Sequence, residues 1–498
     1  MLHYEGIIFT SAGAVFLMRR GFRCKTIFSG GFLMENHGLT KKYGLITAIA
    51  MVIGIVIGSG VFFKAEVMLN KTSGDLPIAL LAWLLGGTVM VISAYVFAVM
   101  GTKFEKVNGV VDYTEAFVGR KYAYYVGWFM SAAYYPAMTS ALAWLSARYT
   151  FAIFGITDVA SGEVMTLAAF YLAMVFAINA LAPKLAGKLQ VSMTAIKLVP
   201  LILMGVVGLI VGLMNGDLSH NLSTFVVDGQ AVENTSWNWG MLIPGVCTSV
   251  FAYEGWVIAT AINSEIKDAK KNLPRALVLG TIVVVAVYML YYIGISGSVP
   301  TAELLEHGAS YAFIQTFGNV AGTILTVFIA VSCLGTLNGL TCACCRGFYS
   351  LAARGEGPNP KFFAKVDEQS GMPANASILS VAVNAFWLFY FFIANLSPIG
   401  EQMGVFAFDS TELPLICVYA FYLPLYVMFM KKGKEFGPFK RFIMPILACL
   451  GACLFVYAAI YTHGMKNLGF LAFAAVIFLL GFIFDKINKK KANSPLEK

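Results

Sequence analysis

The sequence predicts an all-α polytopic membrane protein with twelve transmembrane helices. Of its 498 residues, 59% are hydrophobic and only 12% are charged, a balance that excludes an ordinary soluble globular protein. The apolar residues form continuous runs of about 20, the length that crosses a bilayer as a helix. Within each run, apolar residues do not alternate with polar ones, so the runs do not fit the strands of a transmembrane β-barrel. Two of the runs are interrupted near their middle by residues that weaken a helix.

Twelve apolar runs are long enough to span a membrane. They are residues 44–69, 77–101, 122–152, 164–182, 190–214, 240–264, 275–297, 318–348, 376–394, 403–430, 440–463 and 466–485. The segments between them are short, and we expect a short outer helix to begin at Thr301. No segment is long enough for a separate soluble domain.

The distribution of positive charge predicts the orientation. With the N-terminus inside, the cytoplasmic loops and tail hold 26 of the 35 Lys and Arg residues. The outer loops hold four, which are Lys64, Lys71, Arg148 and Lys466. Positive residues concentrate on the cytoplasmic side of membrane proteins, so both termini are predicted to be cytoplasmic, with a basic tail at 486–498. The net charge of +9 therefore reflects topology, and we expect no nucleic-acid partner.

The first 33 residues do not fit this pattern. The apolar stretch Ile7–Met18 is too short to span a bilayer, and four basic residues follow it. A signal peptide has its positive charge before the apolar stretch. We expect residues 1–33 to be an N-terminal extension, either a start-site artefact ahead of Met34 or a disordered segment.

Metal, cofactor and enzyme chemistry find no support in the sequence. Eight of the nine cysteines lie in or at the ends of apolar spans, where cysteine is typically a small packing residue. The sequence Cys342-Ala-Cys344-Cys345 lacks the second pair or nearby histidine of a zinc site. All five histidines lie in loops or at a helix end, and no nucleophile–base arrangement is visible. We therefore expect no metal, no cofactor and no catalytic residues.

The two interrupted runs indicate a binding site. The first contains Gly58-Ser59-Gly60, and the second contains Phe251-Ala252-Tyr253-Glu254-Gly255-Trp256. Each break lies in the first span of one half of the chain, so spans one to five and six to ten form two halves that must be inverted relative to one another. Paired broken helices in inverted repeats mark the mid-membrane site of a transporter. The alternative is close helix packing through Gly54 and Gly58.

Several motifs, in order, resemble the amino acid–polyamine–organocation transporters. They are the Gly58-Ser59-Gly60-Val61-Phe62 break, Phe251–Trp256, the stretch from Asn263 to Arg275, and Gly335-Thr336-Leu337-Asn338-Gly339. The resemblance covers residues 38–485 and is nearest to bacterial relatives of the L-amino acid transporters, of the serine/threonine-exchanger type. It implies the leucine-transporter type of fold, with repeat one at about 44–214, repeat two at about 240–430, and two extra helices at about 440–485.

The resemblance also implies which groups hold an amino acid. A broken helix offers free N–H groups at one end and free carbonyls at the other. By resemblance, the substrate carboxylate is assigned to Ser59, Gly60 and Val61, and the ammonium to the carbonyls of Val56, Phe251 and Glu254. Gly58 and Ala252 complete the two breaks.

Lys197 is an isolated charge among apolar residues. It resembles the fifth-helix lysine of sodium-independent members, which fills the place of a sodium ion between the first and eighth helices. Its expected neighbours are the backbone of Gly54–Gly58 and either Ser332 or Thr336. The alternative is that its ammonium reaches a lipid headgroup.

Glu254 departs from the pattern of many relatives. An ionisable residue at membrane depth is by default a functional candidate. Its carboxylate could attract the substrate ammonium, bind a proton, or act as a neutral structural hydrogen-bonding group. It therefore leaves the side-chain preference open between neutral and small polar or cationic amino acids.

The remaining site candidates are less specific because aromatic residues are frequent throughout the chain. The candidates for the side-chain pocket are Tyr134, Tyr135, Tyr253, Trp256 and Ser332, with packing as the alternative role. Glu265 and the basic run Lys267–Arg275 are either an inner latch or a solvated loop.

We therefore expect a sodium-independent transporter, an exchanger of neutral L-amino acids across the plasma membrane by alternating access. A proton-coupled symporter using Glu254 or Lys197, and a sensor that binds amino acids without moving them, are the alternatives. The expected partners are an amino acid and the lipid bilayer. The outer loop at about 153–163 lacks cysteine, so no disulfide-linked heavy chain is expected.

Overall fold

The computed structural model describes residues 8–9, 15–16, 44–58, 60–103, 109–156, 158–234, 239–257, 266–367, 369 and 371–492. The chain divides into two units, Met1–Lys41 and Lys42–Lys498. In the first unit, strands β1 (Ile8–Phe9) and β2 (Val15–Phe16) pair antiparallel. The rest of the predicted extension at 1–33, and the last six residues of the predicted tail, lie outside the described residues.

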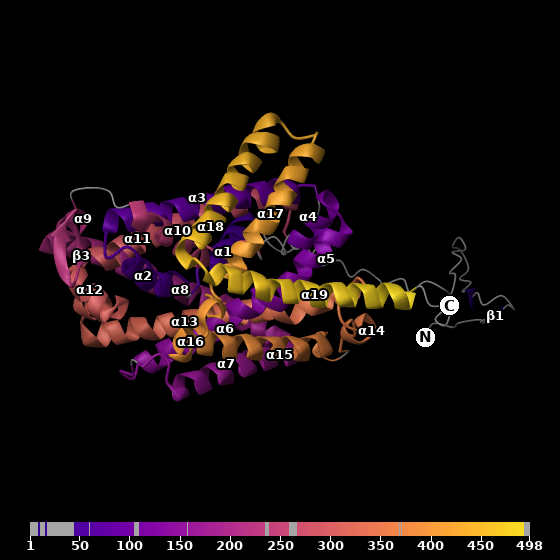
Figure 1. Ribbon diagram of the computed structural model, residues 1–498, viewed down its shortest axis with the longest axis horizontal. Coiled ribbons are helices and arrows are strands. Elements are labelled where there is room, and N and C mark those ends of the chain that lie inside the picture. Colours follow the sequence, from indigo (N-terminus) through magenta and orange to yellow (C-terminus); the bar gives the residue numbers. More distant parts are fainter. Residues whose placement is uncertain are drawn as a thin grey trace, which may run out of the picture. The chain divides into compact units, whose positions relative to one another are not determined.

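The second unit is built from helices (Figure 1). Its first part contains α1 (Leu45–Val56), α2 (Gly60–Lys71), α3 (Leu76–Gly101), α4 (Val110–Phe117), α5 (Arg120–Phe129), the π-helix η1 (Met130–Tyr134), α6 (Tyr135–Ala152), α7 (Gly162–Leu181), α8 (Pro183–Asn215) and α9 (Asp217–Ser223). An antiparallel hairpin of β3 (Thr224–Val227) and β4 (Gln230–Glu233) follows.

The second part of this unit continues in the same way. It contains α10 (Trp239–Ala252), α11 (Ala269–Gly297), α12 (Thr301–His307), α13 (Ala309–Ala353), α14 (Pro360–Phe363), α15 (Ala374–Phe391), the π-helix η3 (Phe392–Leu396), α16 (Ile399–Gln402), the 3-10 helix η4 (Gly404–Phe406), α17 (Leu413–Lys432), the π-helix η5 (Phe439–Ile443), α18 (Met444–His463) and α19 (Lys466–Ala492). The predicted outer helix at Thr301 is α12.

Within the described residues, nine helices are long and apolar enough to cross a membrane. They are Leu76–Gly101, Gly162–Leu181, Ile196–Asn215, Lys270–Gly297, Tyr311–Ala353, Ala374–Leu396, Leu413–Lys432, Phe439–His463 and Lys466–Lys490. Each overlaps one of the twelve predicted spans. The chain is therefore a multi-pass membrane protein.

The other three predicted spans are each divided. The first consists of α1 and α2, twelve residues each, on either side of the glycine-rich break. The third consists of α5, η1 and α6, with the π-helix in the middle. The sixth begins as α10 and continues as a turn at 253–257, beyond which residues 258–265 lie outside the described part.

The predicted start of the tenth span is wrong in the structure. The tenth span was predicted to begin at residue 403, but α17 begins at Leu413. Asp409 Oδ1 accepts hydrogen bonds from the backbone N–H of Thr411 at 2.6 Å and of Glu412 at 2.9 Å. These bonds hold a turn at residues 410–412 immediately before α17, so the helix starts after the apolar residues 404–408.

The helices pack in two groups that meet along α8 and α11. One group contains α1, α3, α10 and α11, and the other contains α6, α7, α13 and α15; α8 contacts both α11 and α13. In Figure 1, α7 and α15 lie beside α6 and α13, while α3, α10 and α11 lie together above them. The short elements α9, β3 and α12 gather at one end of the bundle, and α4, α5 and α14 at the other.

Buried amides connect the helices of the second group to α8. Asn179 on α7 donates to Asn338 Oδ1 on α13 at 2.9 Å, and Asn338 donates to the Ala186 carbonyl of α8 at 3.0 Å. Both amides are buried. A buried polar group that is fully paired fixes how its neighbours pack, so these bonds position α13 against α7 and α8.

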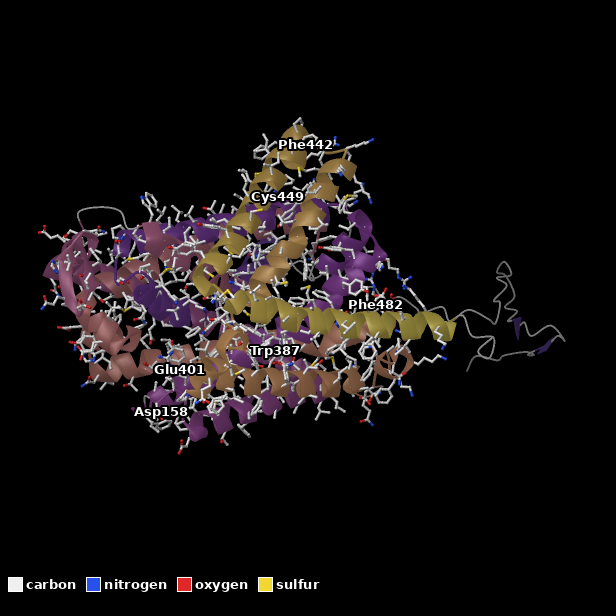
Figure 2. The ribbon with its side chains drawn as sticks, in the orientation of Figure 1. Asp158, Trp387, Glu401, Phe442, Cys449 and Phe482 are labelled. Atoms are coloured by element: carbon white, nitrogen blue, oxygen red, sulfur yellow. The ribbon has the colours of Figure 1, made fainter. Side chains whose placement is uncertain are left out.

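The last helices present apolar side chains on their outside. Figure 2 labels Phe442 and Cys449, where η5 and α18 stand out from the rest, and Phe482 on α19. Phe442 is 42% exposed and Phe482 is 39% exposed, whereas Trp387 on α15 is buried and donates its indole N–H to Ala132 O at 2.9 Å. Large exposed apolar faces on spanning helices fit contact with lipid.

An ion-pair network joins the end of α13 to α4 and α5. Arg354 Nη2 lies 2.5 Å from Glu115 Oε2, and its Nη1 lies 3.4 Å from Asp112 Oδ1. Glu356 bridges Arg354 at 3.5 Å and Arg120 at 3.0 Å. The Arg354 side chain is only 16% exposed, so its charge-assisted hydrogen bonds are better shielded from water than ordinary surface pairs.

We expect Arg354→Ala to lower the stability of the folded protein. Hydrogen bonds to charged groups contribute about 1.5–3 kcal/mol, and the substitution removes the guanidinium that Asp112 and Glu115 share. The matched control is Lys489→Ala, which removes the exposed pair with Asp485 on α19 and should cost only about 0.3–0.5 kcal/mol. Thermal unfolding in detergent measures both, and equal melting temperatures for the two variants would contradict the assignment.

Candidate substrate site at the paired helix breaks

The first break separates α1 from α2. The last helical residue of α1 is Val56, and Ile57 is extended at φ −68° and ψ 106°. Gly58 follows, and α2 begins at Gly60; Ser59 lies outside the described residues. Because the last carbonyls of α1 and the first N–H groups of α2 have no helical partners, the break offers acceptors and donors side by side.

The glycines of this break are required by close contacts. A Cβ atom on Gly58 would come within 2.6 Å of Thr336 Oγ1 on α13. A Cβ atom on Gly60 would come within 2.9 Å of the Ala252 Cα atom, which is backbone and cannot turn aside. The first break therefore touches α13 on one side and the end of α10 on the other.

The second break follows α10. The helix ends at Ala252, and the Tyr253 N–H donates to Ser249 O at 3.2 Å while the Glu254 N–H donates to Phe251 O at 3.4 Å. Gly255 has φ +103°, a conformation that favours glycine. The negative end of the α10 dipole therefore lies next to the start of α2, whose dipole end is positive.

Lys197 supports the first break from α8. Its ammonium donates to the Gly54 carbonyl at 3.3 Å and to Thr336 Oγ1 at 3.1 Å, and the side chain is buried. Gly335 makes room for it, since a Cβ there would lie 3.1 Å from Lys197 Cε. The structure thus brings together α1, α8 and α13 at one cation, and Lys197 does not reach a headgroup position in this arrangement.

Glu254 is buried beside Tyr134. The Tyr134 hydroxyl, on the π-helix η1, donates to Glu254 Oε1, and both side chains are buried. Trp256 donates its indole N–H to the Tyr419 hydroxyl at 3.2 Å. Because π-helical segments often occur at functional sites, the distortion at η1 and the break after α10 define one wall of the candidate site.

The other predicted pocket residues divide into two kinds. Tyr253 stacks on Tyr288 at 5.3 Å and meets the Trp83 edge at 5.5 Å, which is a packing role against α3 and α11. Tyr288 in turn donates to Val56 O at 3.0 Å. Ser332 is buried on α13, and its hydroxyl has no hydrogen-bond partner among the described residues.

Comparison with known proteins decides the family. Residues 43–483 match the amino acid permease family, which is nearly the whole second unit. The chain belongs to the amino acid permease family. Both the matched residues and the predicted range 38–485 include the two breaks, Lys197 and the Gly335–Gly339 motif.

Individual permeases show the same relationship. The chain is 27% identical to the serine/threonine exchanger SteT of Bacillus subtilis (strain 168) over 470 residues, which covers 92% of this chain and 99% of that protein. It is 28% identical to the human b(0,+)-type amino acid transporter 1 over 349 residues, 69% of each. It is 27% identical to the human large neutral amino acids transporter small subunit 2, over 68% of this chain and 62% of that one.

The sequence pattern did not predict a charged cluster that lies next to the two breaks of this permease. Lys64 was placed among the outer-loop residues, but it lies on α2, buried, with its ammonium 2.6 Å from Glu412 Oε1. The same ammonium lies 5.1 Å from the centre of the Phe251 ring and 5.2 Å from the Phe63 ring. Two ionisable residues inside or at the edge of apolar spans were the available signal.

The C-terminal half of α2 has a second ion pair. Arg148 Nη2 on α6 lies 3.1 Å from Glu66 Oε2, and both groups line a cavity of about 590 Å³ together with residues of α12 and α13. Lys64 and Glu66 therefore bind α2 to α17 and α6, respectively. The predicted inner latch is described only in part: Glu265 lies outside the described residues, and Lys267 is exposed.

Proposed function

We propose that this permease is a sodium-independent exchanger of neutral L-amino acids in the plasma membrane. The observation that supports this best is the direct contact between the two helix breaks at Gly60 and Ala252. There, free N–H groups of α2 face the carbonyl ends of α1 and α10. The N–H groups can donate to the carboxylate of an amino acid, and the carbonyls can accept from its ammonium. The relatives that are named as exchangers or amino acid transporters support the same assignment.

The paired breaks offer partners for both charges of an amino acid zwitterion. The substrate carboxylate accepts from the backbone N–H groups of Gly60 and Val61 and from Ser59, and the positive dipole end of α2 stabilises it. The substrate ammonium donates to carbonyls of Val56, Phe251 and Glu254. The Val56 carbonyl already accepts from Tyr288, but a carbonyl oxygen has two lone pairs.

The position of Lys197 supports sodium independence. A sodium ion binds to carbonyl and hydroxyl oxygens, and the oxygens of Gly54 and Thr336 already hold the Lys197 ammonium at 3.3 and 3.1 Å. A fixed positive charge at this point would repel a second cation strongly in a medium of low dielectric constant. The lysine therefore gives the first break the support that an ion would otherwise provide.

The inverted 5+5 repeat, with twelve spans in all, is supported by which helices touch. The first span packs on the seventh, as α1 on α11, and the sixth packs on the second, as α10 on α3. In a 5+5 repeat, span one corresponds to span six and span two to span seven. The contact between spans one and seven therefore corresponds to the contact between spans six and two. We place both termini in the cytoplasm from the charge asymmetry, and we assign no disulfide-linked heavy chain because residues 153–163 contain no cysteine.

Alternating access then requires α2 and α10 to move together. The two helices, which touch at Gly60, move as one block, while α6 and α13 form the opposite wall of the site. In the described conformation the site is closed, since Val56, Tyr134 and Glu254 are at most 8% exposed. Opening on either side exposes the same pair of breaks, which is the arrangement that an exchanger needs.

A second candidate function is proton-coupled symport. The specific observation in its favour is the buried Glu254 carboxylate, whose hydrogen bond from Tyr134 gives it a defined partner inside the membrane. Protonation of Glu254 would remove a charge from the site in one half of the cycle.

Uptake into reconstituted vesicles distinguishes the two. For an exchanger we expect labelled serine to enter vesicles loaded with unlabelled serine and to be near background in empty ones, with no dependence on added sodium. Strong uptake into empty vesicles, driven by acid outside, would replace exchange by proton symport. Absence of flux with saturable binding would support a sensor.

We expect Glu254→Gln to change substrate preference more than it changes maximal flux. The amide still accepts the Tyr134 hydrogen bond, so no buried hydroxyl loses its partner, a loss that would cost about 1–3 kcal/mol. Competition of labelled serine uptake by all twenty amino acids measures the preference. Tyr134→Phe is the matched control that removes the bond and keeps the carboxylate, and complete loss of flux for every substrate in Glu254→Gln would reject the selectivity role.

A further inference from the structure

Cys247, Glu412 and His463 converge from three helices next to α2. Cys247 lies in α10, Glu412 immediately precedes α17, and His463 is the last residue of α18. Cys247 and Glu412 are buried, and the His463 side chain is 11% exposed. Among the described residues, this is the group of His, Cys, Asp and Glu side chains whose ligand atoms lie close enough together to share a metal ion.

The three ligand atoms form a small triangle. Cys247 Sγ lies 3.3 Å from Glu412 Oε2, His463 Nε2 lies 3.1 Å from the same oxygen, and the sulfur and nitrogen lie 3.7 Å apart. In a tetrahedral zinc site, ligand atoms at their usual bond lengths are separated by about 3.3–3.6 Å. The triangle therefore matches one face of such a site to within a few tenths of an ångström.

The types of ligand atom select the class of ion. A thiolate and an imidazole favour soft or borderline divalent ions such as Zn²⁺ and Cd²⁺ over Mg²⁺ and Ca²⁺, which take oxygen ligands. Three protein ligands leave a fourth tetrahedral position open for water or an anion. His463, at the exposed edge of the cluster, gives an ion a route to the other two ligands.

The charges around the three ligands determine how strongly a divalent ion binds. The thiolate and the carboxylate together neutralise a divalent ion, and the thiol proton passes to solvent when the metal binds. Lys64 remains 2.6 Å from the other carboxylate oxygen, Glu412 Oε1, and also contacts Thr411 Oγ1 at 3.2 Å. Its positive charge weakens the site and favours an anion such as chloride in the open position. The carboxylate of Asp409, in the turn before α17, offsets part of that charge.

We propose that Cys247, Glu412 and His463 form a binding site for one Zn²⁺ or Cd²⁺ ion. Cys247 and His463 lie 216 positions apart, and only the fold brings them together. The sequence pattern, which predicted no metal site, therefore could not indicate this one. A bound ion joins α10 to α17 and α18. As a consequence that rests on the proposed function, an ion that holds α10 in place slows exchange, because α10 must move with α2.

Metal binding is measured without transport. The full-length protein is purified in detergent without a histidine tag, and Zn²⁺ binding is followed by titration calorimetry, with the cadmium–thiolate absorption band as a second readout for Cd²⁺. We expect one tight equivalent in the native protein. Removal of a direct ligand in Cys247→Ala or His463→Ala should weaken binding more than the 10- to 100-fold typical of outer-shell changes.

Matched variants separate this site from general metal binding. Cys417→Ala and His307→Ala remove one free cysteine and one histidine elsewhere and should keep the tight equivalent. Lys64→Met removes the repelling charge and should tighten binding at least tenfold. Unchanged stoichiometry and affinity in both Cys247→Ala and His463→Ala would overturn the proposal.

The effect on transport is scored separately. We expect saturating Zn²⁺ to lower serine exchange in the native protein several-fold, and to have no effect on the remaining exchange of Cys247→Ala. Tight binding with no inhibition would leave the metal site standing and reject the coupling of α10 to exchange. Inhibition that persists in Cys247→Ala would overturn the link between this site and transport.

Discussion

Gly60→Ala is expected to lower amino acid uptake roughly 5- to 150-fold, while the protein still folds and reaches the membrane. The new methyl group would lie 2.9 Å from Ala252 Cα, so the start of α2 and the end of α10 must separate. Overpacking of this kind costs about 1–3 kcal/mol, equivalent to a roughly 5- to 150-fold change in an equilibrium. Initial rates of labelled serine uptake, normalised to the amount of reconstituted protein, measure the effect.

Gly187→Ala is the matched control for this substitution. Gly187 lies inside α8, and nothing lies within 4 Å of the position of its added Cβ. An alanine there should raise stability slightly, by about 0.4–1 kcal/mol, and leave uptake unchanged. If Gly60→Ala and Gly187→Ala transport equally well, contact between the two breaks is not needed for transport.

Lys197→Met is expected to have the second large effect. The substitution preserves an unbranched side chain but leaves the Gly54 carbonyl and Thr336 Oγ1 without the ammonium that lies 3.3 and 3.1 Å from them. Hydrogen bonds to a charged group contribute about 1.5–3 kcal/mol, so the affinity for substrate should fall roughly 10- to 150-fold. Uptake measured across a range of serine concentrations gives the change.

Two further variants test whether the Lys197 ammonium itself is needed for substrate affinity. Lys188→Met removes an exposed lysine from the same helix, α8, and should transport like the native protein. Thr336→Val keeps the shape of the partner but removes its oxygen, and should show part of the Lys197→Met defect. Normal affinity in Lys197→Met, or sodium-stimulated uptake in the native protein, would contradict the role given to this lysine.

The positions of the breaks could be predicted because glycine acts locally. Gly58 and Gly60 weaken a helix whatever surrounds them, and α1 and α2 indeed end and begin at this point. The apolar runs likewise depend only on composition and length. The proximity of Lys197 to the first helix was predicted from a resemblance, and in the structure its ammonium lies 3.3 Å from the Gly54 carbonyl oxygen.

Other features depend on contacts between distant residues and could not be predicted. Lys64 looks like an outer-loop residue until Glu412, 348 positions away, is placed beside it. The start of α17 at Leu413 depends on Asp409, which ends an apolar run that composition alone would continue. Tyr253 was a reasonable pocket candidate, but its packing on Trp83 and Tyr288 requires the positions of α3 and α11.

The central claim is that the paired breaks bind the substrate, and direct binding tests it without any transport step. Labelled serine is added to the purified protein in detergent, and saturable binding is compared among the native protein, Gly60→Ala and Gly187→Ala. We predict saturable binding to the native protein and to Gly187→Ala, displaced by unlabelled neutral amino acids, and roughly 5- to 150-fold weaker binding to Gly60→Ala. Full binding by a well-folded Gly60→Ala variant would show that the amino acid binds elsewhere.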